Sequence, residues 1–224
     1  MSTFAARLRK FYASLRAPRV PAGIHVMNPY RTAPVKRYTA AFLDKFYNDD
    51  EPRSLIFGIN PGRFGAGITG ITFTDPIALA DFCGIPNHLP RRRELSSVFI
   101  YDVIAAYGGV GKFYSRFLLT AMCPLGFTRN DVNLNYYDVK TLEKAVTPFI
   151  VRSIETHIAI GGRRDRAIVL GNGVNAKYLR ALNAQHGFFK DIVAVEHPRF
   201  ILQYRRKRVA EFTDKYLKAF RGIT

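Results

Sequence analysis

Short apolar runs alternate with helical patterns along most of the chain, from about residue 51 onward. The first run, Ser54–Asn60, is followed directly by Pro and Gly, which is typical of a buried strand that enters a turn. Three similar runs follow, each bounded by Gly, Pro or charged residues: Phe117–Met122, Ala167–Leu170 and Ile192–Val195. Continuous apolar runs of this length indicate strands that are buried on both faces, as in a parallel sheet.

Helical spacing of apolar residues separates these runs. The predicted helices are Ile77–Cys83, Ser96–Tyr107, Val139–Glu155, Val174–Gln185 and a final basic helix from Arg205 to Phe220. Alternating strands and helices predict an α/β fold, a three-layer α/β/α sandwich with a short, mostly parallel central sheet. Ligands of such sheets bind outside the carboxyl ends of the strands, so we expect the functional site there.

The first 50 residues have a different pattern. Apolar positions at helical spacing predict an amphipathic basic helix over Thr3–Leu15. Pro18–Lys36 holds four prolines without a clear period and is predicted to be a loop, and Tyr38–Tyr47 is predicted to be a second helix. We therefore expect one domain over residues 1–224, in which a wrap-around extension (1–50) precedes an α/β core (51–224).

The composition adds a strong positive charge. The 224 residues include 34 Lys and Arg against 17 Asp and Glu, which gives a formal net charge of +17 and a pI near 10.2. A basic excess of this size attracts polyanions, because each cation set against a phosphate releases a counterion. Nucleic acid is therefore the first partner to consider. Hydrophobic residues make up 48% of the chain, which permits a substantial core and excludes disorder as the main description.

Several classes of protein are disfavoured. No apolar run approaches the ~18–20 residues of a membrane span, and the first residues lack an apolar export core, so we expect a cytoplasmic protein without membrane contact. The two cysteines, Cys83 and Cys123, cannot build a four-cysteine zinc or iron–sulfur site. We therefore expect chemistry without a metal or cofactor.

A glycine-rich segment follows the first predicted strand. Gly58–Phe73 carries five glycines in sixteen residues, so its backbone can approach a ligand closely. The segment can cradle a planar base or a phosphate, with Asn60 at the strand tip and Phe73 available for stacking. A tight turn with structural glycines is the alternative interpretation.

A histidine follows the last predicted strand, in the sequence Val195–Phe200. At a strand's carboxyl end, His197 is well placed to donate a hydrogen bond to a leaving group. Arg199 or Phe200, on the same predicted loop, can enter a DNA stack. The alternative is a structural, hydrogen-bonding histidine.

Together the two segments resemble the single-strand-selective monofunctional (SMUG) branch of the uracil-DNA glycosylase superfamily. The first motif of that family reads Gly-Met-Asn-Pro-Gly-Pro-Phe-Gly, with Thr-Gly and Phe at fixed spacing behind it, and the second begins His-Pro. A Cys-Pro-Leu strand end and a Gly-x-Gly helix start lie between them. The matches, within about residues 50–220, are Gly58–Gly65 except Ile59 and Arg63, Thr69-Gly70, Phe73, Cys123-Pro124-Leu125, Gly171-Asn172-Gly173 and His197-Pro198. The Cys-Pro-Leu-Gly-Phe and Asn-Tyr-Tyr sequences are similar to those of a bacterial SMUG-like subgroup.

The resemblance implies a monofunctional DNA glycosylase of base excision repair, and we expect a monomer, because a repair enzyme that scans DNA can work alone. Such an enzyme flips uracil or another deaminated base out of DNA and hydrolyses its N-glycosidic bond without metal or cofactor. Asn60 would position the water, and His197 would stabilise the charge that grows on the departing base. Phe73 would stack on the base, and the pocket would be lined by Gly58, Ile59, Pro61, Gly62 and Phe64.

The resemblance also implies contacts to the DNA around the flipped base. Arg199 and Phe200 are the candidate wedge residues that hold the gap in the duplex. Arg205 and Arg206 would grip phosphates, and Gly171, Asn172 and Gly173 would offer helix-start amides to a phosphate. A solvated helix face is the alternative for the basic run.

One departure concerns base recognition. The family reads the uracil edge with an Asn two residues before the cysteine of Cys-Pro-Leu, where this chain has Ala121. Asn133 and Asn135 are candidates for a replacement amide, because an amide presents both a donor and an acceptor to a pyrimidine edge. A polar turn is the alternative for this pair. Uracil is the first choice of base, with other deaminated bases such as xanthine open.

Two other function classes compete with this interpretation. Gly171-Asn172-Gly173-Val174-Asn175-Ala176 is similar to the dinucleotide fingerprint of oxidoreductases, but a lone fingerprint late in the chain is a weak signal. A non-catalytic nucleic-acid binder would account for the charge and the aromatic residues. It does not account for Asn60 and His197 at the carboxyl ends of two predicted strands.

Overall fold

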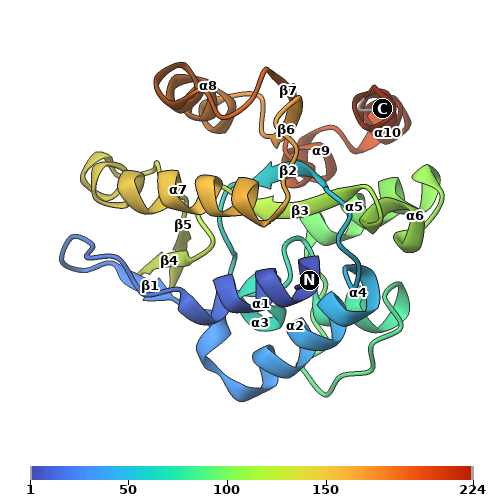
Figure 1. Ribbon diagram of the computed structural model, residues 1–224, viewed down its shortest axis with the longest axis horizontal. Helices are drawn as coiled ribbons and strands as arrows, with labels where there is room; N and C mark the ends of the chain where they lie inside the picture. The colour runs from blue at the N-terminus through green and yellow to red at the C-terminus, as the bar shows by residue number, and fades with distance from the viewer. Residues whose placement is uncertain (1, 223–224) are drawn as a thin grey trace.

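The computed structural model describes residues 2–222, and its centre is a parallel sheet. The strands are β2 (Ser54–Gly58), β3 (Phe117–Ala121), β6 (Arg166–Leu170) and β7 (Asp191–Val195). They pair in the order β3-β2-β6-β7, and all three pairings are parallel (Figure 1). The four apolar runs of the sequence are thus confirmed as strands of one parallel sheet.

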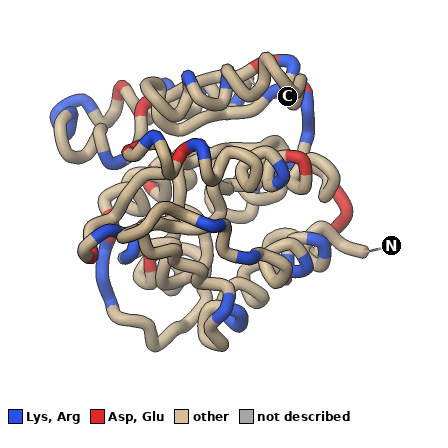
Figure 2. The backbone as a smooth tube through the Cα atoms, turned by 90° about the vertical axis from the view of Figure 1, so that its left-hand side faces the viewer, with Lys and Arg blue, Asp and Glu red and all other residues tan. Residues whose placement is uncertain are grey.

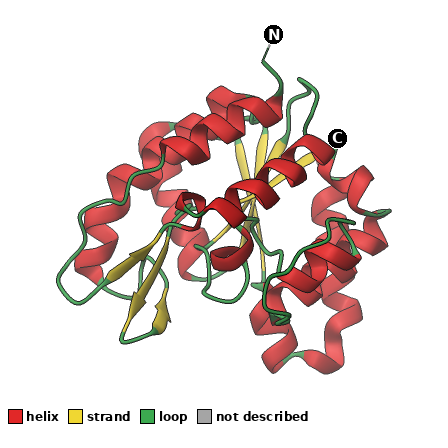
Figure 3. Cartoon of the chain, turned by 90° about the horizontal axis from the view of Figure 1, so that it is seen from below, coloured by secondary structure: helices red, strands yellow, loops and turns green. Residues whose placement is uncertain are grey.

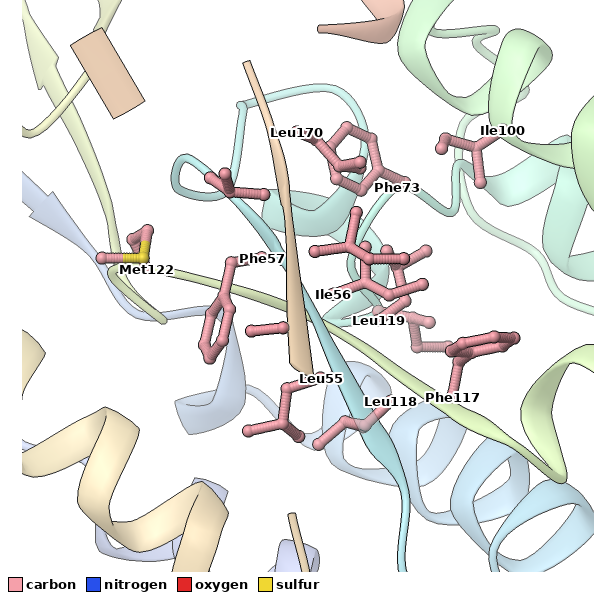
Figure 4. Close-up of a cluster of buried hydrophobic side chains, with 14 of the residues drawn as sticks. Leu55, Ile56, Phe57, Phe73, Ile100, Phe117, Leu118, Leu119, Met122 and Leu170 are labelled. Carbon is pink, nitrogen blue, oxygen red and sulfur yellow. The ribbon is translucent and has the colours of Figure 1, made fainter. Parts of the chain in front are cut away.

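The central strand β2 is buried on both faces. Leu55 and Phe57 point to one side of it and Ile56 to the other (Figure 4). All three side chains are fully buried. The consecutive apolar residues of this strand follow from that arrangement, because helices cover each face of the sheet.

Helices form the two outer layers. α7 (Lys140–Ile160) and α8 (Val174–His186) lie on one side of the sheet, and α5 (Leu95–Tyr107), α9 (Pro198–Tyr204) and α10 (Val209–Arg221) on the other (Figure 1). Shorter helices are α3 (Ala66–Thr69), α4 (Pro76–Asp81) and α6 (Val110–Tyr114). The sheet enclosed by helices is also visible from below (Figure 3), and the predicted three-layer α/β/α sandwich is confirmed.

Some helix boundaries differ from the predictions. α7 continues to Ile160 through Pro148, which lies on the exposed side of the helix, where water can satisfy the carbonyl that proline leaves unpaired. The final helix begins at Val209 and not at Arg205, because the 3-10 turn η2 (Arg206–Arg208) precedes it. α6 was not predicted.

A second, antiparallel sheet stands apart from the first (Figure 3). It consists of β1 (His25–Met27), β4 (Gly126–Arg129) and β5 (Val132–Leu134), in the order β1-β4-β5. The prediction that Pro18–Lys36 is a loop is therefore wrong in part: the segment holds β1, the 3-10 turn η1 (Pro29–Arg31) and the start of α2 (Ala33–Phe46). β1 depends on its distant partner β4, and a local pattern does not reveal such pairing.

The N-terminal extension packs into the same core as the sheet. α1 (Phe4–Ser14) is the helix predicted over Thr3–Leu15, and its Phe4, Leu8 and Phe11 belong to the main hydrophobic cluster. The Tyr47 hydroxyl, after α2, donates a hydrogen bond to the Phe117 carbonyl of β3 at 3.0 Å. Residues of the extension therefore support the edge strand of the sheet directly.

Basic residues are spread over most of the chain and do not gather on one element (Figure 2). The net charge by itself therefore does not identify a binding face. Within residues 2–222, no helix combines the length and apolar character needed to cross a membrane.

Candidate active site

A pocket of about 330 Å³ opens at the carboxyl edge of the parallel sheet. Residues following β2, β5 and β7 line it, together with the first turns of α5 and α9. Its volume lies within the range of small-molecule sites. Asn60 and His197, from two strand ends far apart in the sequence, both line this pocket.

Asn60 is held by the loop that follows β5. Its Oδ1 accepts a hydrogen bond from the Tyr136 backbone N–H at 3.0 Å, and its Nδ2 donates to the Leu134 carbonyl at 3.1 Å. These two bonds fix the orientation of the amide and leave one lone pair of Oδ1 for a further donor. Asn60 can therefore orient a small polar molecule in the pocket.

His197 is the N-cap of α9. Its Nδ1 accepts a hydrogen bond from the Arg199 backbone N–H at 3.2 Å, so the proton of the neutral ring lies on Nε2. Burial and, second, the charge of Arg199 lower the pKa of His197 to about 4. At neutral pH the side chain is therefore an uncharged hydrogen-bond donor.

Phe73 forms a wall of the pocket beside His197. The two ring centroids are 5.8 Å apart. The Phe73 ring lies against the Cα of Gly58, where an added Cβ would come within 2.6 Å of it. The backbone of Phe73 has φ +54°, a conformation that costs free energy in a non-glycine residue and that often occurs at functional sites.

Three pocket residues bear on how the edge of a base is read: Ala121, Asn133 and Asn135. Ala121 lines the pocket and offers no side-chain hydrogen bond. Asn133, on β5, accepts a hydrogen bond from the Arg63 backbone N–H at 3.2 Å. Asn135 donates to the Asp138 carboxylate at 3.2 Å. Both asparagines line the pocket, and each keeps part of its amide available to a ligand.

The wedge candidates lie on a helix, and the prediction of a loop at this point is wrong. Pro198 occupies the first turn of α9, and His197 caps it, an arrangement that favours a helix start. Arg199 and Phe200 line the pocket from this helix, and Phe200 is 39% exposed. Arg205 follows α9, with its guanidinium 5.2 Å from the centroid of the Phe200 ring. Arg206 lies exposed in η2, outside the pocket.

Besides Arg205 and Arg206, four predicted site residues lie outside the pocket lining. The guanidinium groups of Arg63 and Arg92 lie over the Phe64 ring, at 4.7 and 3.6 Å from its centroid. Gly171, Asn172 and Gly173 form the turn between β6 and α8, where Gly171 has φ +114°. This turn adjoins the His197 loop, since the Asn172 amide donates to the Glu196 carboxylate at 3.3 Å.

The structure adds one charged pocket residue that the sequence analysis missed. Glu94 is half-buried at the N-terminus of α5 and lines the pocket. Burial raises its pKa; the charge of Arg199 opposes this shift, and that of Asp75 adds to it. The signal in the sequence was a lone acidic residue between a run of three arginines and an apolar helix.

Metal ligands do not gather in the described part of the chain. Within residues 2–222, no group of three or more His, Cys, Asp or Glu side chains is placed to hold an ion. Both cysteines are buried and unpaired.

Comparisons with known proteins identify the family. The family model of the uracil DNA glycosylase superfamily matches residues 45–221. No curated protein was found to match the chain. The crystal structure of wild-type Pedobacter heparinus SMUG2 is similar over 99% of this chain and 98% of that chain, with 45% sequence identity and a TM-score of 0.96. The chain therefore belongs to the uracil DNA glycosylase superfamily, within which it is similar to bacterial SMUG2.

Proposed function

We propose that this DNA glycosylase removes uracil or another deaminated base from DNA, as a monofunctional enzyme of base excision repair. The observation that carries the proposal is the position of Asn60 and His197 on one pocket of about 330 Å³, with Phe73 in its wall. A pocket of this kind suits a single everted base.

His197 acts on the leaving group. When the N-glycosidic bond breaks, the electron pair moves onto the base and negative charge grows on a carbonyl oxygen. The Nε2–H of the neutral His197 imidazole donates a hydrogen bond to that oxygen. Because the pKa of His197 is about 4, the ring is uncharged at neutral pH before the bond breaks. The donor is fixed beforehand by the Arg199 N–H, so no reorganisation is needed during the reaction.

Asn60 acts on the water. The free lone pair of its Oδ1 can accept one water hydrogen, while the bonds to Leu134 and Tyr136 prevent the amide from rotating. In a reaction with oxocarbenium character, orientation of the nucleophile contributes much of the rate.

The remaining residues bind the substrate. Phe73 stacks on the everted base, a contact worth ~1–3 kcal/mol in single-strand systems. Arg199 or Phe200 enters the gap that the base leaves, and Arg205 and Arg206 contact phosphates. Asn133 and Asn135 read the base edge in place of the amide that Ala121 lacks. The enzyme is expected to act as a cytoplasmic monomer without a metal.

The test is base release by the purified protein in the presence of a chelator. Oligonucleotides carrying uracil, hydroxymethyluracil, hypoxanthine or xanthine are incubated with excess enzyme and then cleaved with alkali at abasic sites. We expect abasic sites with at least one of these bases, and none with the double variant Asn60→Ala/His197→Ala, which controls for contaminating glycosylases. Binding of the oligonucleotides without abasic sites from any base would favour a non-catalytic DNA binder.

A further inference from the structure

The Glu94 carboxyl group lies in the pocket without a partner from the protein. Within residues 2–222, no side chain or backbone donor hydrogen-bonds it, and it does not cap its own helix. Asp75, the neighbouring N-cap carboxylate, is the opposite case. Its Oδ1 accepts from the Ile77 and Ala78 N–H groups at 2.9 and 2.8 Å, and its Oδ2 from the Glu94 N–H at 2.9 Å. Partly buried carboxylates without donors cost free energy, so stability does not explain Glu94.

The glycine loop is shaped around this carboxyl group. A Cβ on Gly65 would overlap Glu94 Oε2, and a Cβ on Gly62 would come within 3.1 Å of Oε1. The loop that carries Asn60 therefore closes on Glu94 because two of its positions lack side chains. This packing places a carboxylate beside the loop on which the water is oriented.

The attacking water loses a proton during the hydrolysis, and Asn60 and His197 offer no base that could accept it at neutral pH. Asn60 carries an amide, which is not a base at neutral pH, and its Nδ2 is already bonded to Leu134. In His197 the Nδ1 lone pair is occupied by the Arg199 N–H, and Nε2 carries the proton. Of the described residues that line the pocket, only Glu94 carries a carboxyl group.

We propose that Glu94 is a further catalytic residue, whose ionised carboxylate accepts a proton from the attacking water. The C1′–N bond breaks and its electron pair leaves on the base, the water oxygen bonds to C1′, and one water proton passes to Glu94. That proton later returns to solvent or to the released base. The negative charge also stabilises the cationic sugar electrostatically. This inference rests on the proposed function.

Burial and charged neighbours affect the pH range in which the Glu94 carboxyl group is ionised. Asp75 faces it from the start of α4 and Arg199 from α9, while Arg63 belongs to the glycine loop. Because burial raises the pKa of Glu94 above its usual value of 4.5, its protonation precedes that of His197 as the pH falls.

The experiment compares single-turnover base excision by wild type, Glu94→Gln and Asp102→Asn across acidic and neutral pH. Glutamine keeps the shape that fits Gly62 and Gly65 but accepts no proton. Asp102→Asn makes the same charge change on α5 outside this pocket. At neutral pH we expect Glu94→Gln to be slower by about 100-fold, with substrate affinity and thermal midpoint unchanged, whereas Asp102→Asn behaves as wild type.

The pH profile provides the second measurement. The wild-type rate should fall as Glu94 becomes protonated, and Glu94→Gln should lack this loss and keep only the loss near the pKa of His197, about 4. A Glu94→Gln enzyme that is as fast as wild type, or slower with the wild-type acidic loss retained, overturns the inference. So does a loss of rate for one base of the panel only, which would make Glu94 a reader of the base edge. Wild type that releases no base overturns the proposed function itself.

Discussion

Two histidines of this glycosylase have the same pKa of about 4 but different surroundings. His157, on α7, lies in the hydrophobic core, and His197 lines the pocket. In both, burial is the main cause of the lowered pKa. A strongly perturbed pKa therefore does not by itself distinguish a catalytic histidine from a structural one.

The hydrogen bonds of the ring nitrogens distinguish the two histidines. His157 Nδ1 donates to the Ser153 carbonyl at 2.7 Å, and Nε2 accepts from the Thr120 hydroxyl at 3.1 Å, so both nitrogens are used inside the protein. In His197 the protein uses Nδ1 alone, and the protonated Nε2 is left for a ligand. The two rings thus hold opposite tautomers, and His197 alone keeps a donor for the pocket.

The largest effect is expected from His197→Ala. Loss of a pre-placed donor to the leaving base should lower the single-turnover rate by about 10²–10³-fold, with DNA affinity nearly unchanged. His197→Asn is the matched control, because its side-chain oxygen can still cap α9. Equal activity of His197→Asn and wild type would show that the imidazole itself is not required for base release.

Asn60→Ala is expected to lower the rate by about 100-fold, because the water loses its orienting group. It should also destabilise the fold by ~1–2 kcal/mol, since the Leu134 carbonyl and the Tyr136 N–H lose their partner. Urea unfolding and single-turnover assays on the same samples separate the two effects. A parallel loss of DNA affinity would contradict an action confined to the transition state.

His157→Leu should alter stability and leave the rate of the folded enzyme unchanged. At neutral pH, loss of the hydrogen bond to the buried Thr120 hydroxyl should cost ~1–2 kcal/mol.

The pH dependence has a definite sign. Between pH 6.5 and about 4 the unfolded imidazole binds a proton that the folded one does not, so the free energy of unfolding falls as the pH falls. The part due to His157, on the order of 3 kcal/mol, should be absent in His157→Leu. An unchanged pH slope of the urea midpoint would show that His157 is not buried as a neutral ring.

The sequence allowed the strands and the two strand-end residues to be predicted, because those signals are local. Leu55, Ile56 and Phe57 form a buried apolar run shortly before Asn60-Pro61-Gly62, and His197 lies two residues after Val195, the end of β7. Glu94 had no such signal, since its place in the pocket depends on how α5 packs against the glycine loop. Phe64 matched the family motif, yet the arginine pair beside it comes partly from residue 92. Local sequence patterns therefore did not predict contacts between segments that are distant along the chain.

The smallest effects are expected in the basic segment behind α9, where Arg206 and Arg208 form a matched pair. Arg208 is already neutralised by Glu211, with contacts of 2.6 and 2.8 Å, whereas Arg206 has no carboxylate partner among residues 2–222. If this segment grips phosphates, Arg206→Ala should reduce the slope of log affinity against log salt concentration by ~1, uniformly across DNA sequences. Arg208→Ala should reduce it less, because releasing Glu211 also removes a contact that competes with phosphate. Fluorescence anisotropy over a range of salt concentrations measures both slopes, and equal slopes for wild type and Arg206→Ala would place this segment outside the DNA interface.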